Sequence, residues 1–219
     1  MTIESVLEII YTVSAGVVFL VGAQMYFRKP SPLFVRMIVC VMGCRFLQGL
    51  MELLLVREGV DLNGFTLSTL GAIAQFLFLI CANYGPIDSL CDDGSKKFMK
   101  YRLLAAILPV VIFVVSIFFV HQVADTTASV IMHLVGMLIP LFALYYHIKH
   151  LIIKDVEWGV LKNIRLYNLI GVLNCHCFIA SWLNDSGSLI WKISMVLYIF
   201  VTFTMLPALV HGANKWKSV

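Results

Sequence analysis

Polar and charged side chains lie inside the long apolar stretches of this chain. Arg45, Gln48 and Glu52 fall in one such stretch, and at about 100° per helical residue they share a sector of about 60°. A charge at the centre of a membrane helix costs roughly 2.5–3.5 kcal/mol on insertion scales, so it normally faces protein or water. The stripe predicts a polar cavity that opens outward, with Arg45 at its floor.

Other apolar stretches contribute polar residues to the same predicted site. The candidate ligand-binding residues are Glu8, Arg45, Gln48, Glu52, His133, Asn174 and Lys192. Their charges would pair with one another or receive a small polar ligand. The alternative is that these residues are hydrogen-bonding contacts between helices, which contribute ~0.6 kcal/mol each on average.

The segment Asn174-Cys175-His176-Cys177 has the residue types of a metal site but not the geometry. Helical residues two apart point about 200° apart, whereas zinc needs converging ligands, so no metal site is expected. Of the six cysteines, five lie in predicted spans and Cys91 lies in a basic loop. We therefore expect no structural disulfide.

Histidines raise one cofactor alternative. His133 and His147 are 14 residues apart on one predicted helix, a spacing that can place both on one face. A bis-histidine haem site would need a partner on another helix, and His176 lies at the depth of His133 but on an apolar face. Apart from this haem alternative, the sequence predicts no cofactor.

The elements that must position these residues are membrane helices. The chain is 61% hydrophobic and 13% charged, with a mean hydropathy of +0.94, and a soluble domain has about 25% charged residues. A helix of ~20 apolar residues crosses a bilayer. The pattern predicts an all-α integral membrane protein with one domain over residues 1–219. Its seven-helix bundle has spans at about 5–27, 33–56, 65–84, 101–121, 128–147, 164–183 and 189–211.

Positive charge collects in every second break between these spans. One side receives groups such as Arg28-Lys29, Lys96-Lys97 and the tail lysines, whereas the breaks on the other side hold Arg57. The positive-inside rule then predicts an outside N-terminus and a cytoplasmic C-terminus. The net charge of +4 follows from this topology, so the expected partner is the lipid bilayer of a bacterial cytoplasmic membrane and not nucleic acid.

Two longer connections lie on the predicted cytoplasmic side. Residues 85–100 lack the alternating ligands of a calcium loop and predict a solvated turn. Residues 148–163 mix basic residues with Leu, Ile and Trp, which favours a short amphipathic helix on the inner leaflet. Pro109, Pro140 and Pro207 lie in the inner half of their spans and are predicted conformational pivots, because proline removes a helix hydrogen bond and kinks the axis.

No catalytic motif is present in the sequence: there is no H-E-x-x-H, no Ser/His/Asp arrangement and no glycine-rich phosphate loop. Seven short-looped spans followed by the basic tail HGANKWKSV resemble the seven-helix membrane sensor modules found ahead of bacterial histidine-kinase or DNA-binding output domains. The resemblance covers the arrangement of all seven spans. It implies a module that signals through its cytoplasmic loops to an output domain or a separate partner.

The expected function is therefore a non-enzymatic sensor or receptor-like module that binds a small polar ligand from outside. One alternative is a small transporter or channel subunit, in which the same polar stripe lines a pathway. The other is a haem-binding redox subunit. Small residues such as Gly16, Gly22, Gly43 and Gly171 permit close helix packing within or between chains, which leaves a homo-oligomer open.

Overall fold

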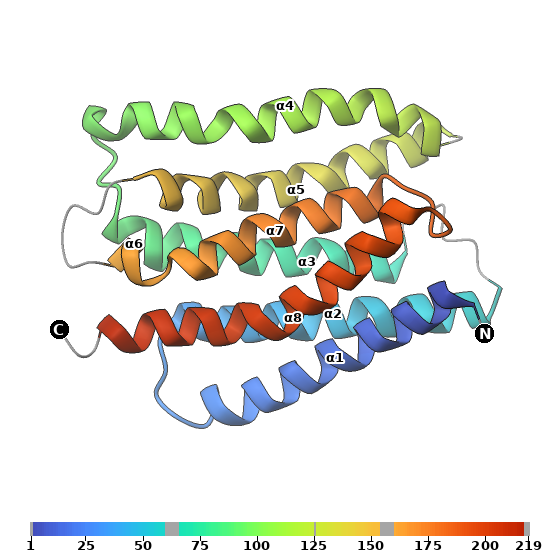
Figure 1. Ribbon diagram of the computed structural model, residues 1–219, viewed down its shortest axis with the longest axis horizontal. Helices are drawn as coiled ribbons and strands as arrows, with labels where there is room; N and C mark the ends of the chain where they lie inside the picture. The colour runs from blue at the N-terminus through green and yellow to red at the C-terminus, as the bar shows by residue number, and fades with distance from the viewer. Residues whose placement is uncertain (1, 60–65, 125, 154–159, 217–219) are drawn as a thin grey trace.

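The computed structural model describes residues 2–59, 66–124, 126–153 and 160–216. These residues form an all-helical bundle (Figure 1). The helices are α1 (Ile3–Tyr26), α2 (Leu33–Arg57), α3 (Leu67–Ala82), α4 (Met99–Val123), α5 (Thr127–Ile152), α6 (Val160–Asn163), α7 (Arg165–Trp182) and α8 (Leu189–Trp216).

Threonines begin three of the helices at the same end of the bundle. The hydroxyls of Thr2, Thr66 and Thr126 each accept a hydrogen bond from a backbone N–H in the first turn of α1, α3 and α5. Such caps satisfy amide groups that have no partner within the helix. The short predicted breaks before α3 and α5 therefore end where the sequence supplies a capping residue.

Six helical segments are long and apolar enough to cross a membrane. They are Ile3–Tyr26, Leu33–Arg57, Leu67–Leu90, Lys96–Val120, Thr127–Ile152 and Leu189–Lys215. They match six of the seven predicted spans. The remaining predicted span, 164–183, forms α7, a continuous helix in the bundle that is not among these six.

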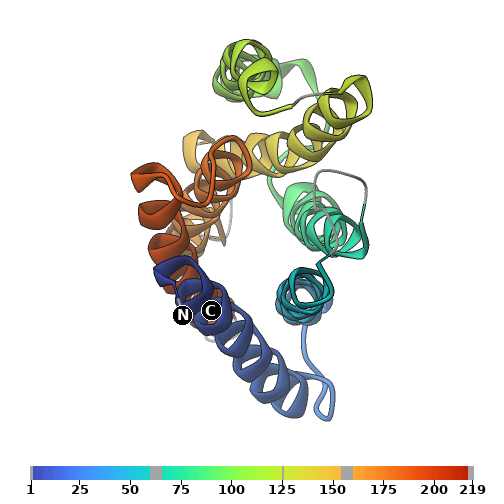
Figure 2. The same cartoon turned by 90° about the vertical axis from the view of Figure 1, so that its right-hand side faces the viewer.

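The helices differ in how much of their surface is buried in the bundle. Along the chain, α1 packs on α2 and α2 packs on α3, while α8 packs against both α1 and α7. The end view places α4 on the periphery, where it packs on α5 (Figure 2). Only 22% of the apolar stretch of α4 is buried, against 50% for that of α8. In a bilayer, α4 is therefore the helix most exposed to lipid, and α8 is central.

The third span continues further than the sequence suggests. After α3, the chain forms a π-helical turn, Asn83–Ile87, which contains Pro86, and then a 3-10 turn, Asp88–Leu90. The helical run thus extends past the predicted boundary at residue 84. A π-helical turn rotates the residues that follow it, and here Asp88 is turned into the protein, where it is 8% exposed.

The three predicted pivot prolines lie inside helices that continue past them. Pro109 is in α4, Pro140 is in α5 and Pro207 is in α8. Of these helices, α8 changes direction visibly along its length (Figure 1), as expected for a helix that contains proline. Whether any of the three acts as a pivot stays a prediction.

Two helices flank the centre of the predicted amphipathic helix at 148–163. α5 continues through Ile152, and the short helix α6 begins at Val160. Residues 154–159, the centre of that prediction, lie outside the described residues.

Candidate functional site

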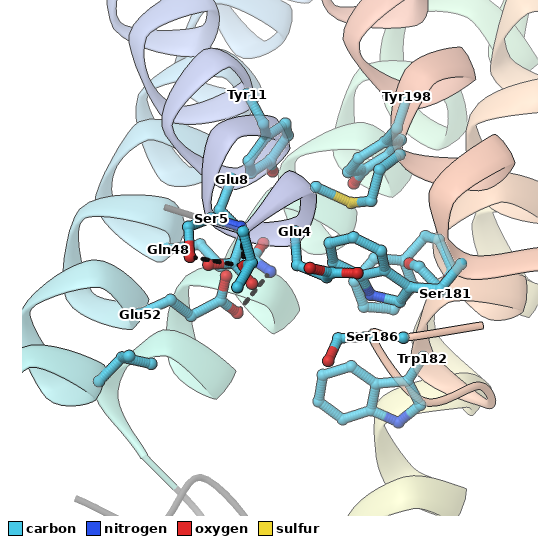
Figure 3. A pocket seen from close by; sticks show the side chains of 16 residues that line it. Glu4, Ser5, Glu8, Tyr11, Gln48, Glu52, Ser181, Trp182, Ser186 and Tyr198 are labelled. Atoms are coloured by element: carbon cyan, nitrogen blue, oxygen red, sulfur yellow. Dashed lines mark hydrogen bonds between the residues drawn. The ribbon is translucent and has the colours of Figure 1, made fainter. Parts of the chain in front are cut away.

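A cavity of about 520 Å³ opens at the end of the bundle that holds the N-terminus (Figure 3). It lies between α1, α2, α7 and α8. Its polar lining includes the carboxylates of Glu4, Glu8 and Glu52 and the amide of Gln48, and its aromatic lining comprises Tyr11, Phe178, Trp182, Trp191 and Tyr198. None of the sixteen lining residues is Lys, Arg or His. The cavity is therefore acidic and aromatic.

A chain of hydrogen bonds leads from this cavity into the core. Gln48 donates its amide N–H to Glu52 at 3.2 Å, and its own amide oxygen accepts from Gln75 at 2.8 Å. The Gln75 oxygen in turn accepts from Arg45 Nε at 3.0 Å. Glu52 at the cavity wall is thus connected to Arg45 through two glutamines, one on α2 and one on α3.

Arg45 is fully buried behind the cavity and does not line it. Its Nη1 donates to the Thr202 hydroxyl at 2.9 Å, and its Nη2 donates to the Asn174 side-chain oxygen. The guanidinium carbon lies 4.4 Å from the centre of the Tyr198 ring, within the range of a cation–π interaction. Over the described parts of the chain, no carboxylate forms an ion pair with Arg45.

Tyr198 joins the cavity to the buried arginine. One edge lines the cavity, and its hydroxyl donates to the Gln75 oxygen at 2.8 Å. Its ring stacks on that of Tyr11, with centres 5.3 Å apart. The Tyr11 hydroxyl is buried and, among the described residues, has no hydrogen-bond partner. Figure 3 shows this hydroxyl pointing toward the cavity.

The rim of the cavity carries an ion pair. Lys192 Nζ lies 2.7 Å from the Glu4 carboxylate, and both side chains are partly exposed. No such partner is found for Glu8 or Glu52 within the described chain. Two of the three cavity carboxylates are therefore left without a cation.

The predicted site residues divide into three groups. Glu8, Gln48 and Glu52 line the cavity. Arg45 and Asn174 lie behind it and contact each other. Lys192 and His133 lie at its margins: Lys192 pairs with Glu4, whereas the His133 ring packs beside Trp182, with ring centres 5.5 Å apart.

The two histidines of the haem alternative each have local contacts. His133 Nδ1 contacts its own helix backbone at Ser129, 2.8 Å away. His147 is fully buried, and its Nδ1 lies 3.0 Å from the Asn168 side-chain oxygen. Its ring fills the space left by the absent side chain of Gly171, because a Cβ there would lie 2.2 Å from His147. The haem alternative stays without a supporting contact.

A second hollow, of about 570 Å³, lies at the end of the bundle that holds the C-terminus. Asp92 contacts Arg102 and lies 3.1 Å from Lys149 Nζ. Lys149 also contacts Asp88, which lies 3.1 Å from His150 Nε2. This cluster is called the inner ionic cluster after the predicted orientation. It corrects the prediction of a solvated turn at 85–100 for Asp88 and Asp92, because α5 brings a lysine that is 3% exposed against them. Other residues of the turn are exposed as predicted, including Asp93, Gly94, Lys96 and Lys97.

The Arg102 guanidinium holds the pKa of the Asp92 carboxyl well below its usual range, and hydrogen bonds from the Gly94 N–H and Lys149 contribute further. Asp92 therefore stays ionised throughout the physiological range. A carboxylate fixed in this way serves as a structural anion rather than a proton donor.

Four residues that connect the cavity with Arg45 were not among the predicted site residues: Tyr11, Gln75, Tyr198 and Thr202. Helical periodicity places Tyr11 on the same face as Glu8, and Gln75 on the same face as Ser68, but it does not mark either as a ligand-binding residue. Tyr198 and Thr202 are four residues apart, so they share one face of α8, but an aromatic and a threonine in an apolar run carry no distinct signal. Their role depends on the buried arginine of another helix.

Comparisons with protein-family models, with curated proteins and with solved structures give no match to this chain. The geometry of the site is therefore the basis for its functional interpretation.

Proposed function

We propose that this chain is a non-enzymatic, receptor-like membrane sensor that binds a small ligand in the acidic, aromatic cavity. The observation that carries the proposal is the hydrogen-bonded chain from Glu52 through Gln48 and Gln75 to Arg45. It connects a cavity open to solvent with a fully buried cation that touches α3, α7 and α8. A ligand that changes the partners of Glu52 or Gln48 changes the surroundings of Arg45.

The proposal includes α7 as a seventh membrane span. Its 18 residues extend about 27 Å at 1.5 Å per residue, close to the thickness of the hydrocarbon core. Asn168 and Asn174, which lower its hydropathy, are fully buried, while Leu166 and Leu169 are exposed. The polar side of α7 thus faces protein and its apolar side is available to lipid, which supports a span held between α5 and α8.

The proposed orientation places the cavity outside the cell. Arg28, Lys29, Lys96, Lys97 and Lys215 all belong to the end of the bundle that holds the C-terminus. Positive charge near membrane helices is retained on the cytoplasmic side. In this orientation, the inner ionic cluster faces the cytoplasm, where an output partner would bind.

Signal transfer would run along α8. This helix carries Tyr198 at the cavity, Thr202 against Arg45 and Pro207 closer to the inner end. A ligand shifts a conformational equilibrium only by its difference in affinity for the two states. Contacts with Tyr198 and Glu52 would provide that difference if α8 moves relative to α2.

Labelling on intact cells tests the orientation and the access to the cavity. Ser186→Cys places a thiol at the cavity, and Lys96→Cys places one at the opposite end. A membrane-impermeant maleimide should label Ser186→Cys and not Lys96→Cys, with the unmodified protein as the background for its native cysteines. The reverse pattern would overturn the proposed orientation.

A small transporter is the second candidate, because polar hollows lie at both ends of the bundle. Fully buried polar residues, such as Gln75, Asn83 and Asn168, lie between the two hollows. Purified protein in liposomes separates the two functions. The sensor proposal expects no uptake of a radiolabelled small amine above that of empty liposomes, and time-dependent uptake would favour the transporter.

A further inference from the structure

We infer that the ligand of the cavity is an organic monoamine: one ammonium group on a compact apolar or aromatic body. This inference rests on the proposed function, since it names the ligand class of the same cavity. Its volume of about 520 Å³ falls within the range of about 300–1,000 Å³ typical of small-molecule sites.

The charge of the lining favours a cation. The lining holds three carboxylates and no cationic side chain among the described residues. Lys192 accounts for Glu4, which leaves Glu8 and Glu52 without a cation, and Arg45 uses its donors on Gln75, Thr202 and Asn174 instead. Unpaired carboxylates near the interior of a membrane protein are costly, so a bound cation is favoured and an anion is opposed.

The aromatic lining favours an organic cation. The Tyr198 ring already contacts the Arg45 guanidinium and the Tyr11 ring. Phe178, Trp182 and Trp191 also line the cavity. Indole and phenyl faces attract a desolvated ammonium and pack against an apolar body. A ligand with one charged group and one apolar portion satisfies both parts of the lining.

The Tyr11 hydroxyl supports the same ligand independently. Tyr11 is 2% exposed, yet its hydroxyl has no partner among the described residues and points toward the cavity. The neighbouring Tyr198 donates its own proton to Gln75. A buried polar atom without a hydrogen bond is unfavourable. An ammonium group in the cavity would donate a hydrogen bond to the Tyr11 oxygen.

An inorganic cation suits the lining less well. Nowhere in the described chain do three or more His, Cys, Asp or Glu side chains converge as metal ligands would. Magnesium and calcium require several oxygen ligands at once. Two carboxylates beside aromatic rings match an organic ammonium better.

The test uses a matched series of compounds on the full chain in nanodiscs at pH 7 and constant ionic strength. The probes are phenethylamine, its neutral analogue phenethyl alcohol, the anion 3-phenylpropionate and MgCl₂. Thermal unfolding and calorimetry should show stabilisation by phenethylamine alone. Glu52→Gln and Glu8→Gln should each weaken its binding about tenfold or more, since each removes a charge-assisted contact.

Tyr11→Phe should weaken phenethylamine binding several-fold while the variant unfolds at or near the wild-type temperature. This second variant keeps the test decisive if a glutamate variant does not fold. Glu58→Gln is the matched control. Glu58 is an exposed carboxylate at the end of α2 that does not line the cavity, so its removal should leave the binding constant unchanged.

The outcomes separate this inference from the proposed function. Stronger stabilisation by the alcohol, the anion or Mg²⁺ than by the amine would overturn the monoamine and leave a sensor for another ligand. The monoamine is also overturned if no probe binds, or if Glu58→Gln weakens binding as much as Glu52→Gln. Uptake of bound phenethylamine into liposomes would overturn the sensor and retain the monoamine.

Discussion

The carboxylates at the two ends of the bundle differ in their partners. At the end that holds the C-terminus, Asp88 and Asp92 both contact Lys149, and Asp92 also contacts Arg102. At the other end, Glu52 receives one hydrogen bond, from Gln48, and no cation among the described residues. At the end that holds the C-terminus, the carboxylates are paired with cations of the chain, whereas among the described residues no cation pairs with Glu8 or Glu52 in the cavity.

This difference matters because a membrane protein gains little from polar groups that have no partner. Hydrogen bonds between membrane helices average ~0.6 kcal/mol, and an unpaired charge in a span opposes folding. A paired cluster is explained by stability alone. The unpaired carboxylates beside the unpartnered Tyr11 hydroxyl instead support the proposed binding site.

The largest effect is expected from Arg45→Ala, which removes the residue that joins the cavity to the core. Three hydrogen bonds and a cation–π contact are lost, and the Asn174 oxygen loses its donor. The free energy of unfolding should fall by about 2–4 kcal/mol. Unfolding in mixed micelles measures this.

Arg45→Lys should recover part of that loss, because an ammonium keeps the charge but not the planar set of donors. Equal stability of Arg45→Ala and the wild type would show that the buried cation does not hold the four helices together. The two ends of the bundle would then be independent.

The next effect concerns the contact between α5 and α7. Gly171→Ala places a Cβ about 2.2 Å from His147, so the ring must move. Overpacking of this kind costs about 1–3 kcal/mol. Gly85→Ala is the matched control, since a Cβ there meets nothing within 4 Å, and it should change the unfolding temperature much less.

Removing one carboxylate from each end tests the difference between the two ends directly. Asp92→Asn should destabilise the protein by about 1–2 kcal/mol, because Lys149 loses a charged partner within the protein. Glu52→Gln should leave the ligand-free protein as stable as the wild type or more stable, since glutamine still accepts from Gln48. Equal losses in both variants, measured by unfolding in mixed micelles, would remove the distinction between the two ends.

The pH dependence of Asp92→Asn follows from its lowered pKa. A depressed pKa in the folded state contributes stability that is fully present above the unfolded value of about 3.9. That contribution is lost only as the pH falls toward the folded value. The stability difference between Asp92→Asn and the wild type should therefore stay constant from pH 5 to pH 8.

The polar faces of the helices could be predicted from the sequence. Helical periodicity places Ser68, Gln75 and Asn83 on one side of the third span, and all three are buried. The six apolar spans followed from hydropathy. α7 shows the limit of that signal, because its buried asparagines lower the mean hydropathy of a helix that lies within the bundle.

Which faces meet could not be predicted from one sequence. Arg45 and Glu52 share a face of α2, which suggested a pair, but Arg45 turns to Gln75 and Asn174 on other helices. The acidic segment after α3 also had no visible partner in the sequence. Lys149 reaches it only because the π-helical turn points Asp88 inward and α5 extends beyond its predicted boundary.

The smallest effect on stability is expected from Lys192→Met at the rim of the cavity. This variant tests whether a partly exposed ion pair contributes less than a buried one. The Lys192–Glu4 pair is as close as many buried pairs, at 2.7 Å, but both side chains are partly exposed. Surface ion pairs contribute little because water and salt screen them. The unfolding temperature should stay within error of the wild type.

Lys192→Met should nevertheless strengthen phenethylamine binding at low salt, because it removes a cation from the rim and frees Glu4. The gain should shrink as the salt concentration rises, since screening acts most strongly on exposed charges. Weaker binding of the amine in Lys192→Met would mean that the lysine positions the ligand. Glu4 would then act as a partner of Lys192 and not as part of a binding site for a cation from solution.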